Sequence, residues 1–182
     1  MATEIQSAKI VTEEIENAAG ANPYNITLGT SVATTSGTAV IYSSIPAGTS
    51  RIIVMGIEVS TNGTVEIRTQ LGTSGGLVTS GYSSIIVGLN SGGVAVETAT
   101  NSLLLAEGVG ASEIRDFTQI LSLVDASRDE WVSSVTGARD STQTECFCGG
   151  GHVDLGGDVT QLKIFMDGSD AFDAGRVNIQ FE

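Results

Sequence analysis

The residues best suited to chemistry are two cysteines and the single histidine of the chain, which lie close together in the sequence. Cys146 and Cys148 flank Phe147 in a predicted strand, and His152 follows in the stretch "GGGHVDL". Residues two apart on a strand point to the same face, so we expect both thiols on one face. With His152 they offer three ligands of the kind that zinc binds, and the sequence supplies no obvious fourth. We favour buried free cysteines and a turn or surface histidine over a metal site.

A second group of candidate ligands lies in "DGSDAFD", where Asp167, Asp170 and Asp173 recur at three-residue steps. A calcium loop usually places its acidic residues at every second position, with a glycine and a distant glutamate. This stretch departs from that pattern, and Asp-Gly and Ser-Asp are ordinary turn formers. A turn is the favoured interpretation, and a weak cation site is the alternative.

The remaining candidates for catalysis do not form a recognisable set. Trp131, the single tryptophan, begins a predicted strand and suits a core anchor better than a sugar-stacking platform. Asp129 and Glu130 are neighbours, and neighbours on a strand point to opposite faces, which does not suit a glycosidase carboxylate pair. A catalytic triad would need His152 as its base, and the chain has no nucleophile-elbow sequence. The sequence predicts a protein without enzymatic activity, cofactor or metal.

Charge limits the classes of partner. The chain has 182 residues and a formal net charge of -13, and its only lysines are Lys9 and Lys163. Such a surface repels phosphates, so we expect no nucleic-acid binding. No apolar run approaches the length that spans a bilayer, and the acidic start does not resemble a secretory signal. We therefore expect synthesis in a cytoplasm and no membrane insertion.

The first 23 residues predict an α-helical arm. Thr3 and Gln6 have the spacing of a capping box, and Gly20 and Pro23 mark the end of the helix. A short helix is marginal alone, so this one is expected to anchor on its own domain, on copies of itself or on another protein. Its apolar positions recur at three- and four-residue steps and comprise Ile5, Ala8, Val11, Ile15 and Ala18.

Residues 24–182 predict a β domain, because the apolar period changes to two and short strands alternate with turn signals. The expected fold is all-β, a jelly-roll-like antiparallel β-sandwich preceded by the helical arm. The strand "RIIVMGIEVS" is apolar on both faces, with Ile53, Met55, Ile57 and Val59 on one. Ile52 and Val54, on the other face, are the candidate trimer interface, because symmetric association would cover surplus apolar surface. The next stretch, "TNGT", predicts an Asn-Gly hairpin.

The closing stretch "SDAFDAGRVNIQFE" predicts a structural corner followed by a last strand. Phe172 can fill the end of the core, Asp173 follows it, and Gly175 permits a tight approach to the strand. Alternation places Val177, Ile179 and Phe181 inward.

Three stretches of the chain resemble a family of bacteriophage tail-fibre and related virion proteins. They are "GTAVIYSSIPAGTSRIIVMGIEVSTNGT", "EIRTQLGTSGGLVTSGYSS" and "LGGDVTQLKIFMDGSDAFDAGRVNIQFE", in the order that the family has them. The resemblance covers residues 37–182, with 90–130 the weakest part. It implies a β-sandwich on the exterior of a phage particle, assembled as a homotrimer with other virion proteins and without catalytic residues. Fibre chains are often much longer, which leaves the place on the particle open.

The resemblance implies one of two functions. The first is a trimeric tail fibre or fibre-tip protein that engages a host surface receptor through loops at one end of the sandwich. The second is a capsid decoration (cement) protein that stabilises the phage head. A glycan-processing enzyme on a fibre is disfavoured, because no supported carboxylate pair is present. Loops 72–84 and 88–100 are the expected contact region, with candidate binding residues Thr73, Ser74, Tyr82 and Asn90.

Overall fold

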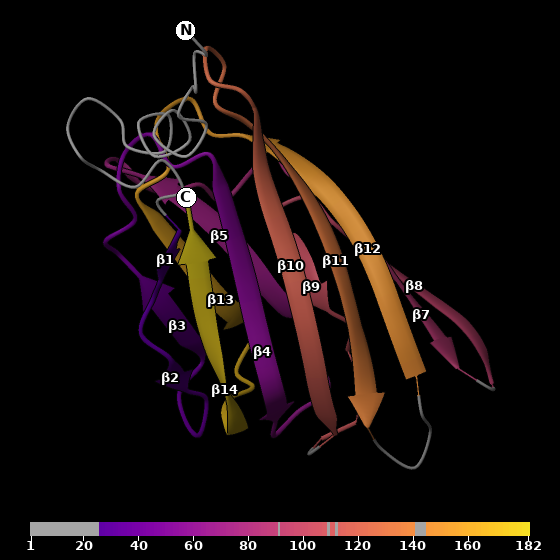
Figure 1. Cartoon of the computed structure of the whole chain (residues 1–182). Coiled ribbons are helices and arrows are strands. Elements are labelled where there is room, and N and C mark those ends of the chain that lie inside the picture. The colour runs from indigo at the N-terminus through magenta and orange to yellow at the C-terminus, as the bar shows by residue number, and fades with distance from the viewer. Residues whose placement is uncertain (1–25, 91, 109, 112, 141–144) are drawn as a thin grey trace, which may run out of the picture.

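The computed structural model describes residues 26–90, 92–108, 110–111, 113–140 and 145–182. These residues form two antiparallel β-sheets packed face to face, with no helix among them (Figure 1). The all-β sandwich that the sequence predicts is confirmed at this level. The predicted helical arm, with Ile5, Ala8, Val11, Ile15 and Ala18, lies outside the described residues.

The larger sheet, sheet A, has nine strands. In spatial order they are β1 (Thr27–Leu28), β14 (Phe172–Phe181), β4 (Arg51–Thr61), β10 (Ile114–Asp125), β11 (Glu130–Asp140), β12 (Glu145–Asp154), β7 (Ser83–Asn90) and β8 (Gly93–Ala99), with β2 (Val32–Ala33) also pairing with β14. In Figure 1 this sheet lies in front. Its first and last strands stand at opposite sides of the view.

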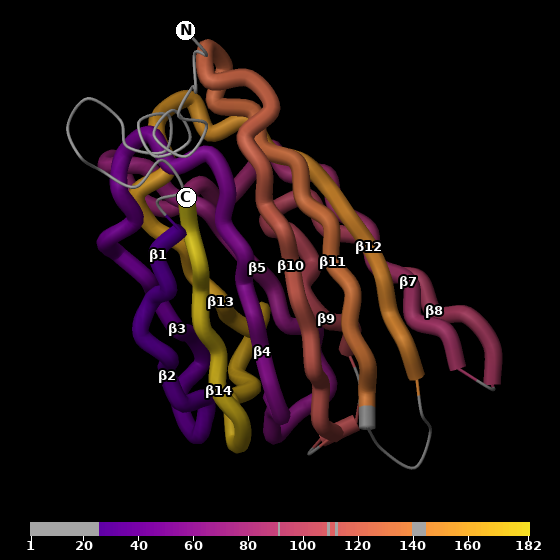
Figure 2. Tube along the Cα trace, in the orientation of Figure 1, coloured from indigo at the N-terminus to yellow at the C-terminus, as the bar shows by residue number. Residues whose placement is uncertain are grey.

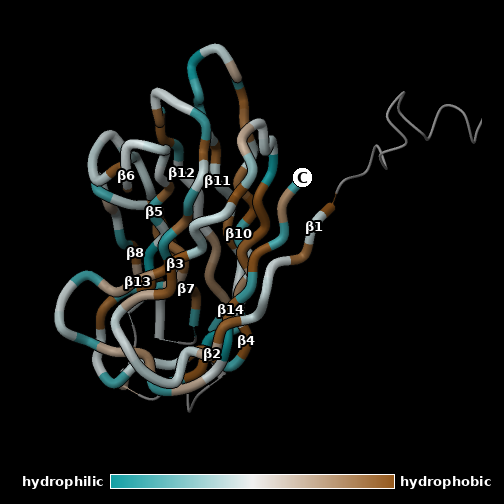
Figure 3. The backbone as a smooth tube through the Cα atoms, turned by 90° about the vertical axis from the view of Figure 1, so that its left-hand side faces the viewer, coloured by the Kyte–Doolittle hydropathy of each residue, from teal (hydrophilic) through white to brown (hydrophobic). Residues whose placement is uncertain are grey.

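The smaller sheet, sheet B, has five strands. They run in the order β3 (Ala39–Tyr42), β13 (Gln161–Met166), β5 (Ile67–Thr73) and β6 (Gly76–Leu77), and β9 (Leu103–Ala106) also pairs with β5. Figure 3, coloured by hydropathy, shows hydrophobic residues along the strands of both sheets. Buried residues of the two sheets pack together in one hydrophobic core. Sheet B therefore covers one face of sheet A and leaves the other uncovered.

The core fills the space between the sheets with alternate residues of each strand. Trp131 is 2% exposed, which agrees with a core anchor. One row across sheet A alternates phenylalanine and glycine: Gly56, Phe117, Gly137 and Phe147 are paired in register. A Cβ at Gly56 would lie 2.3 Å from the Phe117 ring, and one at Gly137 would lie 2.2 Å from the Phe147 ring. Each glycine therefore provides the space that a neighbouring aromatic ring occupies.

The predicted Asn-Gly hairpin is wrong. β4 ends at Thr61 in sheet A, and the next strand, β5, begins at Ile67 in sheet B. The turn between them passes from one sheet to the other, because Asn62 forms hydrogen bonds with Ala171 instead of joining two paired strands.

A shared bulge adjusts β4 to both of its neighbours. The register of β4 shifts against β10 between Arg115 and Phe117 and against β14 between Ala174 and Arg176. Glu58, at this point, adopts a positive φ of 55°. Its backbone N–H donates to Asp116 Oδ1 at 2.7 Å, which holds the bulge from the β10 side. Beyond the bulge β4 ends beside the starts of β10 and β14, opposite the end where the C-terminus lies (Figure 2).

We predict that Gly175→Ala lowers the free energy of unfolding by more than about 1 kcal/mol. Gly175 has φ 88°, and an added Cβ would lie 2.3 Å from the Glu58 carbonyl oxygen. Gly156→Ala is the matched control, because Gly156 has φ 67° and nothing within 4 Å of an added Cβ. Urea denaturation of both variants measures the difference. Equal losses would show that the contact with Glu58 does not matter.

Candidate functional site

The segments that carry the family resemblance meet at one corner of the sandwich, which comprises the turn 59–64 and the segment 170–175. Asn62 N–H donates to the Ala171 carbonyl at 2.9 Å, and Ala171 N–H donates to Asn62 Oδ1 at 2.8 Å. A Cβ at Gly63 would overlap the Asp170 carboxylate, so the turn needs glycine there. Phe172 is 2% exposed and fills the core behind this contact. More than a hundred residues of sequence separate the two segments, and the corner joins them.

The three aspartates of "DGSDAFD" are each committed to a different protein partner. Asp167 forms an ion pair with Arg68 Nη1 at 3.1 Å, and Asp170 Oδ2 accepts from the Val65 N–H at 3.2 Å. Asp173 accepts a hydrogen bond from the Ser60 hydroxyl. These partners hold the carboxylates in a turn and spread them over separate contacts. Within the described part of the chain, no three His, Cys, Asp or Glu side chains form a group that could hold a metal ion.

Cys146, Cys148 and His152 all lie on the outward-facing side of β12. Both cysteines are free and exposed, so the prediction that they are buried is wrong. The inward positions of this strand are taken by the larger Phe147 and by Val153. His152 is exposed, and it lies four residues along the strand from Cys148, too far for the three side chains to converge on one ion.

The assignment of Ile52 and Val54 to a trimer interface is wrong. Both side chains are 0% exposed and pack between the two sheets, where no second subunit can contact them. The other face of β4 carries the surplus apolar surface: Ile53 and Met55 are half-buried and Ile57 is exposed. Val59, expected on this same face, is buried instead, because the bulge at Glu58 interrupts the alternation. The sequence alone could not show which face of β4 is buried between the sheets, because both faces are apolar.

The predicted binding loops do not form one contact region. Thr73 and the exposed Ser74 lie at the end of β5. Tyr82 lies near the same end of the strand. Its hydroxyl accepts a hydrogen bond from the Leu71 N–H at 3.0 Å and donates one to the Val78 carbonyl at 3.1 Å. Asn90 lies at the far end of β7, with its amide on Glu145 Oε2 at 3.0 Å. Tyr82 is 4% exposed and is a structural anchor. Much of the predicted loop 88–100 is the strand β8.

The strand registers define one broad surface on the outward side of sheet A, called the outer face from this point on. One row across it crosses from β4 to β8 through Met55, Thr118, Thr136, Cys148, Val87 and Val96. The next row crosses through Ile53, Ile120, Ser134, Gly150, Ile85 and Thr98. Neither row contains a charged side chain, in a chain whose net charge is -13.

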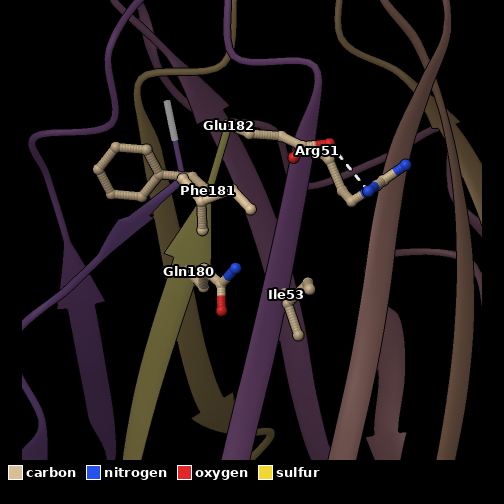
Figure 4. A pocket seen from close by; sticks show the side chains of 6 residues that line it. Arg51, Ile53, Gln180, Phe181 and Glu182 are labelled. Atoms are coloured by element: carbon tan, nitrogen blue, oxygen red, sulfur yellow. Dashed lines mark ion pairs between the residues drawn. The ribbon is translucent and has the colours of Figure 1, made fainter. Parts of the chain in front are cut away.

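A pocket of about 240 Å³ lies at the margin of the outer face, near the end of β14 (Figure 4). Its lining includes Ile26, Ile53 and Gln180, and an ion pair joins Arg51 Nη1 to Glu182 Oε1 at 2.9 Å. Ligand pockets are commonly about 300 Å³ or larger, so this one suits a single inserted side chain better than a small-molecule substrate.

Sequence reasoning missed a buried cluster of acids and arginines, comprising Glu97, Glu107, Arg115, Arg139 and Glu145. Arg139 Nη2 lies 2.5 Å from Glu145 Oε2, and its Nη1 lies 3.2 Å from Glu113 Oε2. A Cβ at Gly88 would overlap carboxylate oxygens of both Glu107 and Glu145, so these carboxyls lie together against a glycine. Arg115 is 0% exposed, and no acceptor among the described residues bonds its guanidinium. The alternation of inward and outward side chains could have revealed this cluster, because Arg115 and Arg139 occupy inward positions of their strands.

Burial and proximity shift the acid pKa values in this cluster in opposite directions. Burial, followed by the hydrogen bond and the charge of Glu145, raises the pKa of Glu107 to about 8. Burial alone would raise the pKa of Glu145, but hydrogen bonds from Glu107 and Asn90 and the charge of Arg139 outweigh it and lower that pKa. Burial also raises the pKa of Glu97 and lowers that of Arg115 to about 10. Glu107 and Glu145 therefore share one proton near neutrality.

This acid pair resembles the general acid and base of an enzyme only in its pKa pattern. Both carboxyls are 3% exposed, so a substrate does not reach them. The pair is therefore a structural element whose proton content changes with pH.

Searches against protein-family models, curated proteins and solved structures found no match. Among the described residues, no helix has the length and hydrophobicity needed to cross a membrane.

We predict that Phe172→Ala lowers the free energy of unfolding by about 3–5 kcal/mol, because it empties the core behind the corner. Phe181→Ala, at a half-buried position of the same strand, should have a smaller effect. Denaturant titration measures both. A chelator should change neither wild type nor variant, and a large loss of stability with chelator would restore the cation-site interpretation of Asp167, Asp170 and Asp173.

We predict that the free energy of unfolding falls as pH rises from about 5 to about 8.5, and that Glu107→Gln reduces this fall. The pKa of Glu107 is raised from 4.5 to about 8 in the folded state, so between these values the folded state binds more protons than the unfolded state. This contribution is complete below pH 4.5 and is lost as pH passes 8. Gln resembles the protonated acid and does not titrate.

Urea titrations at several pH values measure this difference. Glu97, whose pKa is also raised, remains in both proteins and provides a common background. Glu130→Gln, at an ion pair with the exposed Arg128, controls for the change in net charge. Parallel pH profiles for wild type and Glu107→Gln would contradict the prediction.

Proposed function

We propose that this chain is a non-enzymatic structural protein of the bacteriophage virion exterior, a trimeric tail fibre or fibre-tip protein that engages the host surface. The observation that carries the proposal is the corner. Two stretches that resemble the virion family, distant in sequence, bind each other there through Asn62 and Ala171. Residues that resemble a family because they build its scaffold are expected to be in contact, whereas chance similarities are not.

The remaining similar stretch, "EIRTQLGTSGGLVTSGYSS", supports the same interpretation. Its tyrosine, Tyr82, is buried, and its hydroxyl anchors the backbone of Leu71 and Val78 within that stretch. Gln70, from the same stretch, donates to the Asn101 carbonyl at 2.8 Å. The resemblance thus falls on side chains that hold the sandwich together, which suits a structural protein.

Two finer features belong to this proposal. The jelly-roll-like connectivity is supported by the chain's repeated passage between the sheets, which places strands distant in sequence side by side, as in β4 with β14 and β12 with β7. The N-terminal helical arm, residues 1–23, would leave from β1, at the edge of sheet A, and anchor the protein to other virion proteins.

A capsid decoration protein is the second candidate. The described residues form one sandwich with a broad uncharged face, an arrangement that also suits a protein resting on a shell and clamping neighbouring capsid subunits. The host receptor role of the first candidate would fall to the exposed turns, such as Ser74.

Electron microscopy of particles labelled with gold-conjugated antibody tests the proposal. We expect gold at the tail for a fibre and over the head for a decoration protein. Purified particles that lack the protein would contradict both candidates.

We further predict that deletion of residues 1–20 abolishes incorporation into particles while the β domain stays folded. The arm is the expected anchor, and the core of the described residues lies between the two sheets. Incorporation is measured by immunoblotting of purified particles, and circular dichroism of the free protein is the control for folding. Normal incorporation of the truncated protein would contradict the anchoring role.

A further inference from the structure

The outer face of sheet A differs in charge from the rest of the chain. Its two central rows, through Ile120 and Thr118, contain only aliphatic, small polar, amide, thiol and glycine positions. Charged groups begin in the rows on either side of these two: Asp116 and Arg176 lie beyond the row of Thr118, and Arg51, paired with Glu182, lies beyond the row of Ile120. A surface that stays in water usually carries charges of both signs, whereas the centre of a protein interface is depleted of them.

The same face gathers exposed apolar side chains. Ile120 is 40% exposed, Ile85 46% and Val96 58%. Among the described residues, only Ile26 and Ile41 are exposed large hydrophobic side chains outside the strands of sheet A. Single exposed hydrophobic residues are common on any protein, but a continuous patch in strand register marks an interaction surface.

The face is large enough for a stable protein contact. Seven strands from β14 to β8, spaced at about 4.8 Å, give a width of roughly 34 Å. The two uncharged rows and the neighbouring row through Ser122 and Val132, which contains Arg51 at its margin, are spaced by about 6.8 Å along the strands. Together they give roughly 20 Å, and hence an area of about 700 Å². Stable interfaces bury about 800 Å² on each partner, so the face matches one side of such a contact.

We propose that the outer face of sheet A is the surface through which copies of this chain associate. The net charge of -13 makes two copies repel each other over most of their surfaces. Contact through the uncharged rows brings together the parts of each copy that carry no charge, and it removes apolar side chains of both from water. A basic partner would instead gain most by binding elsewhere, where the carboxylates lie.

This inference rests on the homo-oligomer of the proposed function, but not on a location in a phage particle. The arm, residues 1–23, is the competing occupant of the face, because Ile26, which follows it closely in the sequence, lies at the margin of the face. The second copy is favoured by the area and by the charge distribution. Thiol labelling, combined with the oligomeric state, distinguishes a face covered by the arm from a face covered by a second copy.

The test compares Ile120→Lys with Ile41→Lys in the full chain. Ile120 lies at the centre of the outer face, and Ile41, 54% exposed on sheet B, is the matched control. Each variant makes the net charge less negative, so lost association cannot come from general repulsion. Sedimentation equilibrium at micromolar concentrations should show the wild type and Ile41→Lys as oligomers. Ile120→Lys should raise the dissociation constant by about tenfold or more.

The native thiols give an independent measurement of the same contact. Cys148 lies in a central row of the outer face and Cys146 in the row beside it, and both are exposed in the single chain. Maleimide should label them slowly in the oligomer and faster on dilution or in Ile120→Lys. Circular dichroism and melting confirm that both variants are folded, and Thr118→Lys replaces Ile120→Lys if that variant unfolds.

The outcomes distinguish the hypotheses. An oligomer that Ile120→Lys leaves intact, with thiols that label freely, would overturn this inference and leave the proposed trimer standing. A monomeric wild type with freely labelled thiols would overturn both. A monomeric wild type whose thiols are protected would show that the arm covers the face, which would also overturn association through it.

Discussion

The pairing of β4 with β14 is the contact on which the rest of the sandwich depends. β4 is the eleven-residue strand between β14 and β10, and its pairing with β14 brings the last ten-residue strand against a strand from the first third of the chain. The bulge at Glu58 and Gly175 fixes the register, and the corner at Asn62 and Ala171 closes the pair at one end. Once that register is set, alternation assigns every side chain of β4 to a face. Ile52 and Val54 then belong to the core, and Ile53 and Met55 belong to the outer face.

Features that depend on local pattern could be predicted from the sequence. Alternating strands and glycine-rich turns were sufficient for an all-β sandwich, and Trp131 and Phe172 were recognisable as core residues because large aromatic side chains rarely find another place. Local pattern failed where a choice depended on distant partners. Ile52 and Ile53 are equally apolar, and only the position of sheet B decides which is buried. The Asn-Gly turn looked like a hairpin until its partner, Ala171, was known.

The same reasoning explains the candidate sites that sequence placed incorrectly or missed. Tyr82 sits in a polar, turn-rich stretch that suggests exposure, yet its hydroxyl is used on the backbone of Leu71. Glu107 and Glu145 are far apart in sequence, and Gly88 leaves the room in which their carboxyls meet and shift each other's pKa. The alternation of side chains along β10 and β11 would have identified Arg115 and Arg139 as inward-facing charges, but it could not have identified their partners. Contacts between distant segments are the information that a single sequence lacks.

Charged side chains are treated differently in the interior and on the outer face of sheet A. In the interior, Arg139 forms ion pairs with Glu113 and Glu145, which offset the cost of burying its charge, whereas the guanidinium of Arg115 has no hydrogen-bonded acceptor among the described residues. On the outer face, the central positions are occupied by Ser, Thr, Gly and aliphatic residues instead of charges. Hydroxyl groups can bond water while the face is open and can bond a partner once it is covered, whereas a charge would have to be stripped of water. The composition of this face is therefore compatible with the proposed association, in which the chain folds first and its copies meet afterwards.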